Sequence, residues 1–241
     1  MKALVAQTRV EILLTVRRGE SLLLILGIPL LLLGFFSSVD VLPKGDFHEA
    51  VDYLTPGVLA LAVMSTGMVQ LAIGTSFERQ YGVLKRLGAT PLGRPRLLAA
   101  KTVSIIAVEA VQIALLVAFA LALGWDPSVR VGVVAAVVLG TIAFSGLGLL
   151  MAGTLRGEVT LAAANGLYLV LLLIGGMVVP LSELPSGLRF VAELLPSGAL
   201  AQALVGTLTA THPTVPAKAW LVLGAWAVLA PLLAARTFRW E

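Results

Sequence analysis

The sequence predicts an all-α polytopic membrane protein with six transmembrane helices, an N-terminal interfacial helix and a re-entrant external helical segment before the last span. The amino-acid composition indicates this fold class. Of the 241 residues, 59% are hydrophobic and 12% are charged, whereas a soluble domain has about a quarter charged residues and under half apolar ones. The apolar runs stay apolar at odd and even positions alike, which excludes the alternation of a membrane β-barrel.

The same composition excludes several classes of function. The chain has no cysteine, so disulfide scaffolds, thiol nucleophiles and thiolate metal sites are excluded. An intramembrane hydrolase is disfavoured, because both histidines, His48 and His212, fall in predicted external loops and no H-E-x-x-H or G-x-S-G motif occurs. The net charge of +4 does not indicate nucleic-acid binding, because the basic residues lie beside apolar runs and not among aromatic residues.

Six segments are long enough to cross the roughly 30 Å hydrocarbon layer, for which a helix needs about 20 mostly apolar residues. They are 21–39, 54–77, 102–124, 131–155, 160–179 and 219–235. Of the 17 Lys and Arg residues, all but four fall on the face that holds both chain ends; the four on the other face are Lys44, Arg130, Arg189 and Lys218. The positive-inside rule therefore predicts a multi-pass protein of the inner (plasma) membrane with both termini in the cytoplasm.

The first predicted element, residues 1–18, precedes the first span. Gln7, Glu11 and Arg18 share one helical face, and apolar residues gather roughly opposite. This pattern predicts a helix that lies along the inner membrane interface. An ordinary basic flank that orients the first span is the alternative.

The segment 78–96 is the longest and most charged segment predicted on the cytoplasmic face. Its charged residues surround Tyr81, Leu84 and Leu87, which suits a short helix ended by Gly88 and by Pro91 three residues later. A helix with both apolar and charged side chains is what docking of a cytoplasmic partner needs. Charge that serves topology alone is the alternative.

Polar residues within the spans are candidates for a substrate pathway. Glu109 lies in the third span, where an ionised carboxylate costs about 2.5 to 3.5 kcal/mol, so it needs a partner or a proton; a structural carboxylate is the alternative to a role with a proton or cationic substrate. The fifth span carries Asn165 and Tyr168 on one face, and interhelical hydrogen bonding explains them equally well. The second span carries Met64 and Met68, a flexible apolar stripe that could contact varied ligands or serve packing.

The segment 181–217, between the fifth and sixth spans, contains enough leucine to enter the membrane. Arg189, Glu193, Gln202 and the break at Pro196 argue against a further crossing. Two short helices that dip into the outer leaflet and cap the bundle fit better, and such backbone needs protein cover or a wet cavity. A simple surface loop is the alternative.

The chain resembles the membrane subunits of the type 2 ABC transporter permease family, which includes bacterial drug-exporter permeases. The resemblance extends over residues 1–241 as one transmembrane domain, and its specific part is a motif at the end of the second span. That motif consists of Phe77, Glu78, Arg79, Gly82, Leu84, Lys85, Arg86, Leu87, Ala89, Thr90 and Pro91. A looser match before the last span consists of Leu184, Pro185, Leu194, Leu195, Pro196, Ala199 and Leu200.

The resemblance implies an exporter that works as a homodimer or heterodimer, energised by separate ABC ATPase subunits. This chain has no G-x-x-x-x-G-K-[ST] loop, so we expect it to bind no cofactor itself and its partner to bind ATP and Mg²⁺. In the family the segment after the second span touches the ATPase, which implies coupling roles for Glu78, Arg79, Tyr81, Gly82, Leu84, Lys85, Arg86, Leu87 and Pro91.

The resemblance also implies that the fifth span lines or closes the route, with Asn165, Tyr168 and Leu172 as candidate residues. The expected cargo is a small hydrophobic or amphipathic molecule moved outward. A polysaccharide or glycolipid exporter is the first alternative, although a sugar route favours aromatic platforms and only 6% of the chain is aromatic. An ion-coupled secondary transporter that uses Glu109 is the second alternative.

Overall fold

The computed structural model describes residues 2–17, 19–38, 50–88, 94–209 and 214–239. Within these ranges the secondary structure is helical and contains no strand, which confirms the predicted all-α class. The elements in chain order are α1 (Lys2–Arg17), α2 (Gly19–Ser38), α3 (Ala50–Met64), the π-helical turn η1 (Ser65–Gln70), α4 (Leu71–Gln80), α5 (Val83–Gly88), α6 (Arg94–Ala122), α7 (Gly132–Thr154), α8 (Gly157–Ile174), the 3₁₀ turn η2 (Leu181–Glu183), α9 (Ser186–Leu194), α10 (Pro196–Leu208) and α11 (Ala217–Thr237).

Five helices in the described part of the chain are long and apolar enough to cross a membrane. They are Ala50–Gln80, Ala99–Ala122, Gly132–Thr154, Gly157–Ile174 and Ala217–Thr237. The predicted first span corresponds to α2, whose described apolar part, Leu26–Ser38, is shorter. Counting the bent pair α9 and α10 as one broken span raises the number to six. The chain is therefore a multi-pass membrane protein.

The second predicted span is the longest helix of the bundle, and it runs from α3 through η1 into α4. Near its start, the Tyr53 hydroxyl donates a 2.9 Å hydrogen bond to Gly176 O. One turn later, a Cβ on Gly57 would lie 1.9 Å from Met177 O. The small residue thus lets α3 lie directly against the segment that follows α8.

α7 lies inside the bundle and packs against α4, η1, α10 and α11. Two of its glycines explain the close approach. A Cβ on Gly146 would lie 2.5 Å from Pro231 N, and a Cβ on Gly148 would lie 2.7 Å from Met68 O. Because no side chain separates these backbones, α7 holds α11 on one side and the π-helical turn on the other.

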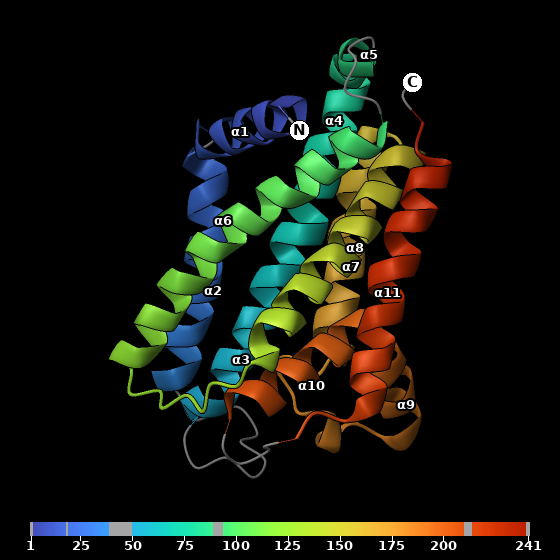
Figure 1. Ribbon diagram of the computed structural model, residues 1–241. Helices are drawn as coiled ribbons and strands as arrows, with labels where there is room; N and C mark the ends of the chain where they lie inside the picture. The colour runs from blue at the N-terminus through green and yellow to red at the C-terminus, as the bar shows by residue number, and fades with distance from the viewer. Residues whose placement is uncertain (1, 18, 39–49, 89–93, 210–213, 240–241) are drawn as a thin grey trace.

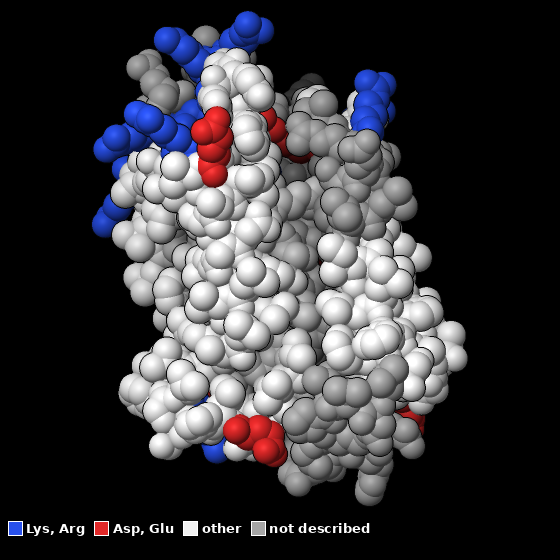
Figure 2. All heavy atoms as spheres, turned by 180° about the vertical axis from the view of Figure 1, so that it is seen from behind, with Lys and Arg blue, Asp and Glu red and all other residues white. Residues whose placement is uncertain are grey.

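The two ends of the bundle differ in structure and charge. α1, α5 and the last turn of α11 lie at one end, and α9 and α10 lie at the other (Figure 1). Lys and Arg side chains gather at the α1 and α5 end (Figure 2), where the exposed cations include Arg9, Arg17, Lys85, Arg86 and Arg236. The helices thus bring the basic flanks of separate spans to one end.

At the other end, α9 and α10 meet at an angle of 88°, on either side of the break predicted at Pro196. Arg130, which precedes α7, donates hydrogen bonds to Gly206 O at 2.8 Å and to Thr209 O at 3.0 Å. α9 in turn is tied to α11, because Trp226 Nε1 donates to Leu194 O at 3.0 Å. The bent pair is therefore anchored at its bend and at the end of α10.

Candidate functional site

The end of α4 turns sharply into α5, and the turn depends on one glycine. Gly82 has a φ of +72°, in the left-handed region that glycine occupies without steric cost. Just before it, the Arg79 guanidinium donates to Leu155 O at the end of α7. The ring of Tyr81 stacks on that of Phe77 with centroids 6.2 Å apart. These contacts fix the direction in which α5 leaves the bundle.

α5 has one side chain buried in the bundle and several outside it. Leu84 is completely buried, in a cluster that includes Leu97 and Phe238, so it anchors α5 and does not face a partner. Leu87 is partly buried beside the same cluster. The outward side chains of α5 are Val83, Lys85 and Arg86, and Tyr81 in the turn before α5 is 72% exposed. Pro91 lies outside the described residues.

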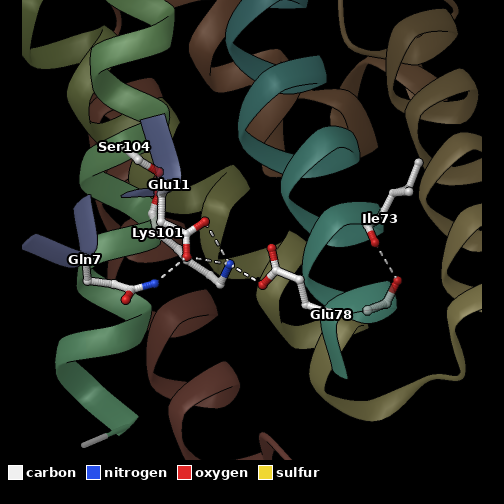
Figure 3. Close-up of polar contacts among 7 residues, drawn as sticks. Gln7, Glu11, Ile73, Glu78, Lys101 and Ser104 are labelled. Carbon is white, nitrogen blue, oxygen red and sulfur yellow. Dashed lines mark hydrogen bonds and ion pairs between the residues drawn. The ribbon is translucent and has the colours of Figure 1, made fainter. Parts of the chain in front are cut away.

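A buried ion cluster joins this end of α4 to α1 and α6 (Figure 3). Lys101 of α6 is 2% exposed, and its Nζ lies 2.6 Å from Glu78 Oε2. The same Nζ lies 3.0 Å from Glu11 Oε1, and Gln7 Nε2 donates to that oxygen at 2.8 Å. The carboxyl group of Glu78 therefore points inward to Lys101, at the start of the segment that leads to α5.

Sequence reasoning missed this cluster. Lys101 precedes an apolar run, as a basic residue that only sets topology would, and the helical pattern of residues 1–18 places Glu11 on a polar face without naming a partner for it. A burial of two carboxylates and one ammonium is tolerated when the charges pair and hydrogen bonds satisfy the rest. The sequence does contain a signal for the cluster, namely the positions of three charged residues: an acid in the first amphipathic helix, an acid at the end of the second span and a lysine at the start of the third.

A cavity of about 440 Å³ lies next to the ion cluster. Its walls come from α1, α2, the α3–η1–α4 helix, α6 and α8, and Glu11, Glu78 and Lys101 are at its border. Most of its lining is apolar, including Ile28, Leu32, Leu61, Val69, Leu71 and Ile73; its polar lining includes Ser65, Gln70, Thr75, Ser104, Asn165 and Tyr168. A volume of this size falls in the range that holds one drug-sized molecule.

The predicted pathway residues divide into cavity and core residues. Asn165 and Tyr168 line the cavity, and Asn165 Nδ2 also donates to Leu161 O of its own helix. Met64 and Met68 are completely buried in the main hydrophobic core and are not part of the lining. Leu172 packs against that core. The methionine stripe thus serves packing in this conformation.

Glu109 lies apart from the cavity, in a layer of polar side chains between α6, η1 and α7. It is 1% exposed, and its Oε2 is in hydrogen-bond contact with Thr141 Oγ1. One turn along α6, Gln112 Oε1 accepts a 2.9 Å hydrogen bond from Thr66 Oγ1. This layer ties three helices together in the bundle interior.

No group of three or more metal-ligating side chains occurs among the described residues. The described geometry therefore consists of an exposed face on α5, a buried ion cluster and a cavity beside that cluster. The family model described as ABC-2 type transporter matches residues 2–209. No curated protein matches the chain.

Proposed function

Because the chain belongs to the ABC-2 type transporter family, whose model covers most of its length, we propose that it is the permease subunit of an ATP-driven exporter. The permease takes up a small hydrophobic or amphipathic molecule and moves it outward across the inner membrane. ATP and Mg²⁺ bind to separate ATPase subunits. Two permease chains, identical or related, form the transmembrane unit.

The observation that carries the proposal is the buried ion cluster beneath α5. A docking helix transmits force only if it is fixed to the helices that move, and α5 is fixed in two ways. Leu84 anchors it in a hydrophobic cluster, and the α4 end that leads to it is bound through Glu78 to Lys101 of α6 and Glu11 of α1. Motion of α5 would therefore move α1, α4 and α6 together.

The docking face consists of the outward side chains of α5 and of the turn that joins α4 to α5. Tyr81 and Val83 supply apolar contacts, and Lys85 and Arg86 supply cationic ones. Other basic side chains gather at this end of the bundle, so the positive-inside rule favours a cytoplasmic location for it. This location is where an ATPase subunit is available.

The cavity supports the proposed class of substrate. Its lining is mostly apolar, and the ion cluster supplies charge at its border. An amphipathic molecule could place its apolar part against Leu32 and Leu61 and its polar part near Asn165 and Tyr168. The expected substrate is thus small, since the cavity is about 440 Å³. Long glycans and glycolipids are the alternative class.

Co-purification with the ATPase subunit tests the docking assignment. We expect the wild-type permease to retain the ATPase, and the double variant Tyr81→Ala, Arg86→Glu to lose most of it while the protein stays inserted and folded. Arg236→Glu is a matched control, because Arg236 is an exposed cation at the same end of the bundle but on α11. Equal retention by the docking variant and the control would contradict the assignment.

A stimulation screen tests the substrate class. The reconstituted complex would be assayed for ATPase activity with dyes, lipids and glycans. We expect Asn165→Leu and Tyr168→Phe to change which amphipathic compounds stimulate, whereas Leu169→Ala, on the exposed face of α8, leaves the profile unchanged. Stimulation confined to polyprenyl-linked sugars would favour the glycan alternative. Transport by liposomes that contain the permease alone would favour a secondary transporter.

A further inference from the structure

The transport proposal gives Glu109 no role. The hydrogen bonds around its carboxyl group show which group must supply the proton between Glu109 and Thr141. Thr141 Oγ1 lies 2.8 Å from the carbonyl oxygen of Val137, one turn earlier in α7. The same Oγ1 is in hydrogen-bond contact with Glu109 Oε2. A threonine hydroxyl has one proton to donate and two lone pairs with which to accept. A carbonyl oxygen and a carboxylate oxygen are both acceptors, so one hydroxyl proton can make a full hydrogen bond to only one of them.

The contacts balance if the second proton belongs to Glu109. A protonated carboxyl group has one O–H donor, which donates from Oε2 to Thr141 Oγ1, while the Thr141 hydroxyl donates to Val137 O. Each donor then has one acceptor. The hydrogen bond between Glu109 and Thr141 joins α6 to α7 and needs the acid in its neutral form.

The surroundings of Glu109 favour the neutral form as well. Its other oxygen, Oε1, is buried and has no hydrogen-bond partner among the described residues. A Cβ on Gly67 would lie 3.4 Å from this oxygen, so the carboxyl group lies directly against the π-helical turn. An ionised carboxylate here would lose its contact with water and would have one polar contact in exchange, which makes the charged form unfavourable. A divalent metal ion, which takes six or more oxygen ligands, would not find them either.

No cation in the described structure compensates a negative charge at this point. Neither η1 nor α7 contains an ionisable residue. Lys101 of α6 lies eight residues earlier, about 12 Å by helical rise, and its ammonium group contacts Glu11 and Glu78. α1, which packs on α6, carries Lys2, Arg9, Glu11 and Arg17, and its Glu11 contacts Lys101. The other helices packed on α3, α6 or α7 carry Glu20 in α2, Asp52 and Tyr53 in α3, Glu78 and Arg79 in α4, Glu158 and Tyr168 in α8, and Lys218 and Arg236 in α11. Among the described residues, no ion pair joins Glu109 to any of them.

We propose that Glu109 is a proton-binding site inside the transmembrane bundle, which takes one proton and uses it to hold α6 to α7 beside the π-helical turn. π-Helical turns often occur at functional sites. The proton leaves when α6 and α7 separate and water reaches Oε1. The site depends on the fold of this chain alone, so it stands or fails independently of the transport assignment.

Infrared difference spectroscopy of the full-length protein in lipid tests the proposal. The difference between wild type and Glu109→Gln should contain one carbonyl band of a protonated carboxylic acid at neutral pH, because the amide is isosteric with the neutral acid and lacks that band. Thr141→Val should shift the band, since the acid loses its acceptor, while Thr141→Ser should restore it. A carboxylate band in place of the acid band would overturn the proposal.

The pH dependence of thermal stability is a second measurement on the same variants. The folded state binds a proton that the unfolded chain releases, so the wild type should lose stability as the pH rises above the ordinary titration range of glutamate. Glu109→Gln cannot release a proton and should show a flatter profile over that range. Parallel profiles for wild type and variant would overturn the proposal, and so would a wild type that gains stability relative to the variant.

Discussion

At the scale of single residues, Lys101 and Glu109 show two ways to place a charge-bearing group inside a membrane protein. Lys101 is compensated by two carboxyl groups from other helices. Glu109 has one neutral hydroxyl as its polar contact. In the first arrangement, paired charged groups lie at the border of a cavity. In the second, the carboxyl group is neutral. Both hold helices together, so a substitution at either position acts on the relative placement of helices as well as on chemistry.

Lys101→Ala should destabilise the protein, because it leaves Glu11 and Glu78 facing each other without the ammonium group. Removing one partner of a buried ion pair costs about 3 to 5 kcal/mol. We expect a loss near the lower end, about 3 kcal/mol, because the two carboxyl side chains are 11% and 16% exposed and water can reach them. The free energy of unfolding in detergent micelles measures the loss.

The matched control for that variant is Lys85→Ala, since Lys85 is exposed on α5. Exposed ion pairs contribute about 0 to 1 kcal/mol, so the control should stay close to wild type in stability. A loss of similar size in both variants would show that Lys101 has no special structural role.

At the scale of the elements, the sequence predicted the position of most helices and missed how they contact one another. Apolar length alone places the segments that become α6, α7, α8 and α11. It does not reveal that η1 interrupts the second span with a wider turn, because Ser65–Gln70 has no proline and one ordinary glycine. The break between α9 and α10 was predictable, since Pro196 is a strong local signal. Backbone contacts between helices depend on tertiary packing, which a single sequence does not encode locally.

Gly146→Ala tests the packing of α7 against α11. The added methyl group would lie 2.5 Å from Pro231 N, and backbone atoms cannot move as a flexible side chain can. Overpacking of this kind costs about 1 to 3 kcal/mol, and the midpoint of thermal unfolding should fall accordingly. Gly224→Ala is the control, because a Cβ there meets nothing within 4 Å and alanine favours a helix. A fall in the control as large as in Gly146→Ala would reject the packing argument.

Arg130→Ala tests the anchor of the bent pair. The variant removes two hydrogen bonds from a charged donor to carbonyls at the end of α10, each worth about 1.5 to 3 kcal/mol. We expect faster amide hydrogen exchange in the last turn of α10, while α8 keeps its wild-type exchange rates. Unchanged exchange at Thr207 and Leu208 would show that the backbone contacts of Ser128 and Arg130 with this turn suffice.

At the scale of the whole molecule, the features assigned to transport follow one axis. α5 lies at the basic end of the bundle and α9 at the opposite end (Figure 1). The cavity borders the ion cluster beneath α5. The distribution of Lys and Arg in the sequence predicted that one end of the bundle is basic. Asn165 and Tyr168 line the cavity, and their role as pathway residues stays a prediction. It could not predict the cavity itself, which forms from side chains of helices that are distant in sequence.

Single introduced cysteines test the orientation of this axis in the membrane. The chain contains no cysteine, so a single introduced cysteine reports its own position without background. The positive-inside rule places the α5 end in the cytoplasm. In intact cells, a membrane-impermeant maleimide should therefore label Ser186→Cys at the start of α9 and should not label Lys85→Cys on α5. Permeabilised cells that express the permease without its ATPase serve as the control, in which both variants should be labelled because both side chains are exposed. Labelling of Lys85→Cys from outside would invert the orientation, remove α5 from the reach of a cytoplasmic ATPase and reject the docking role.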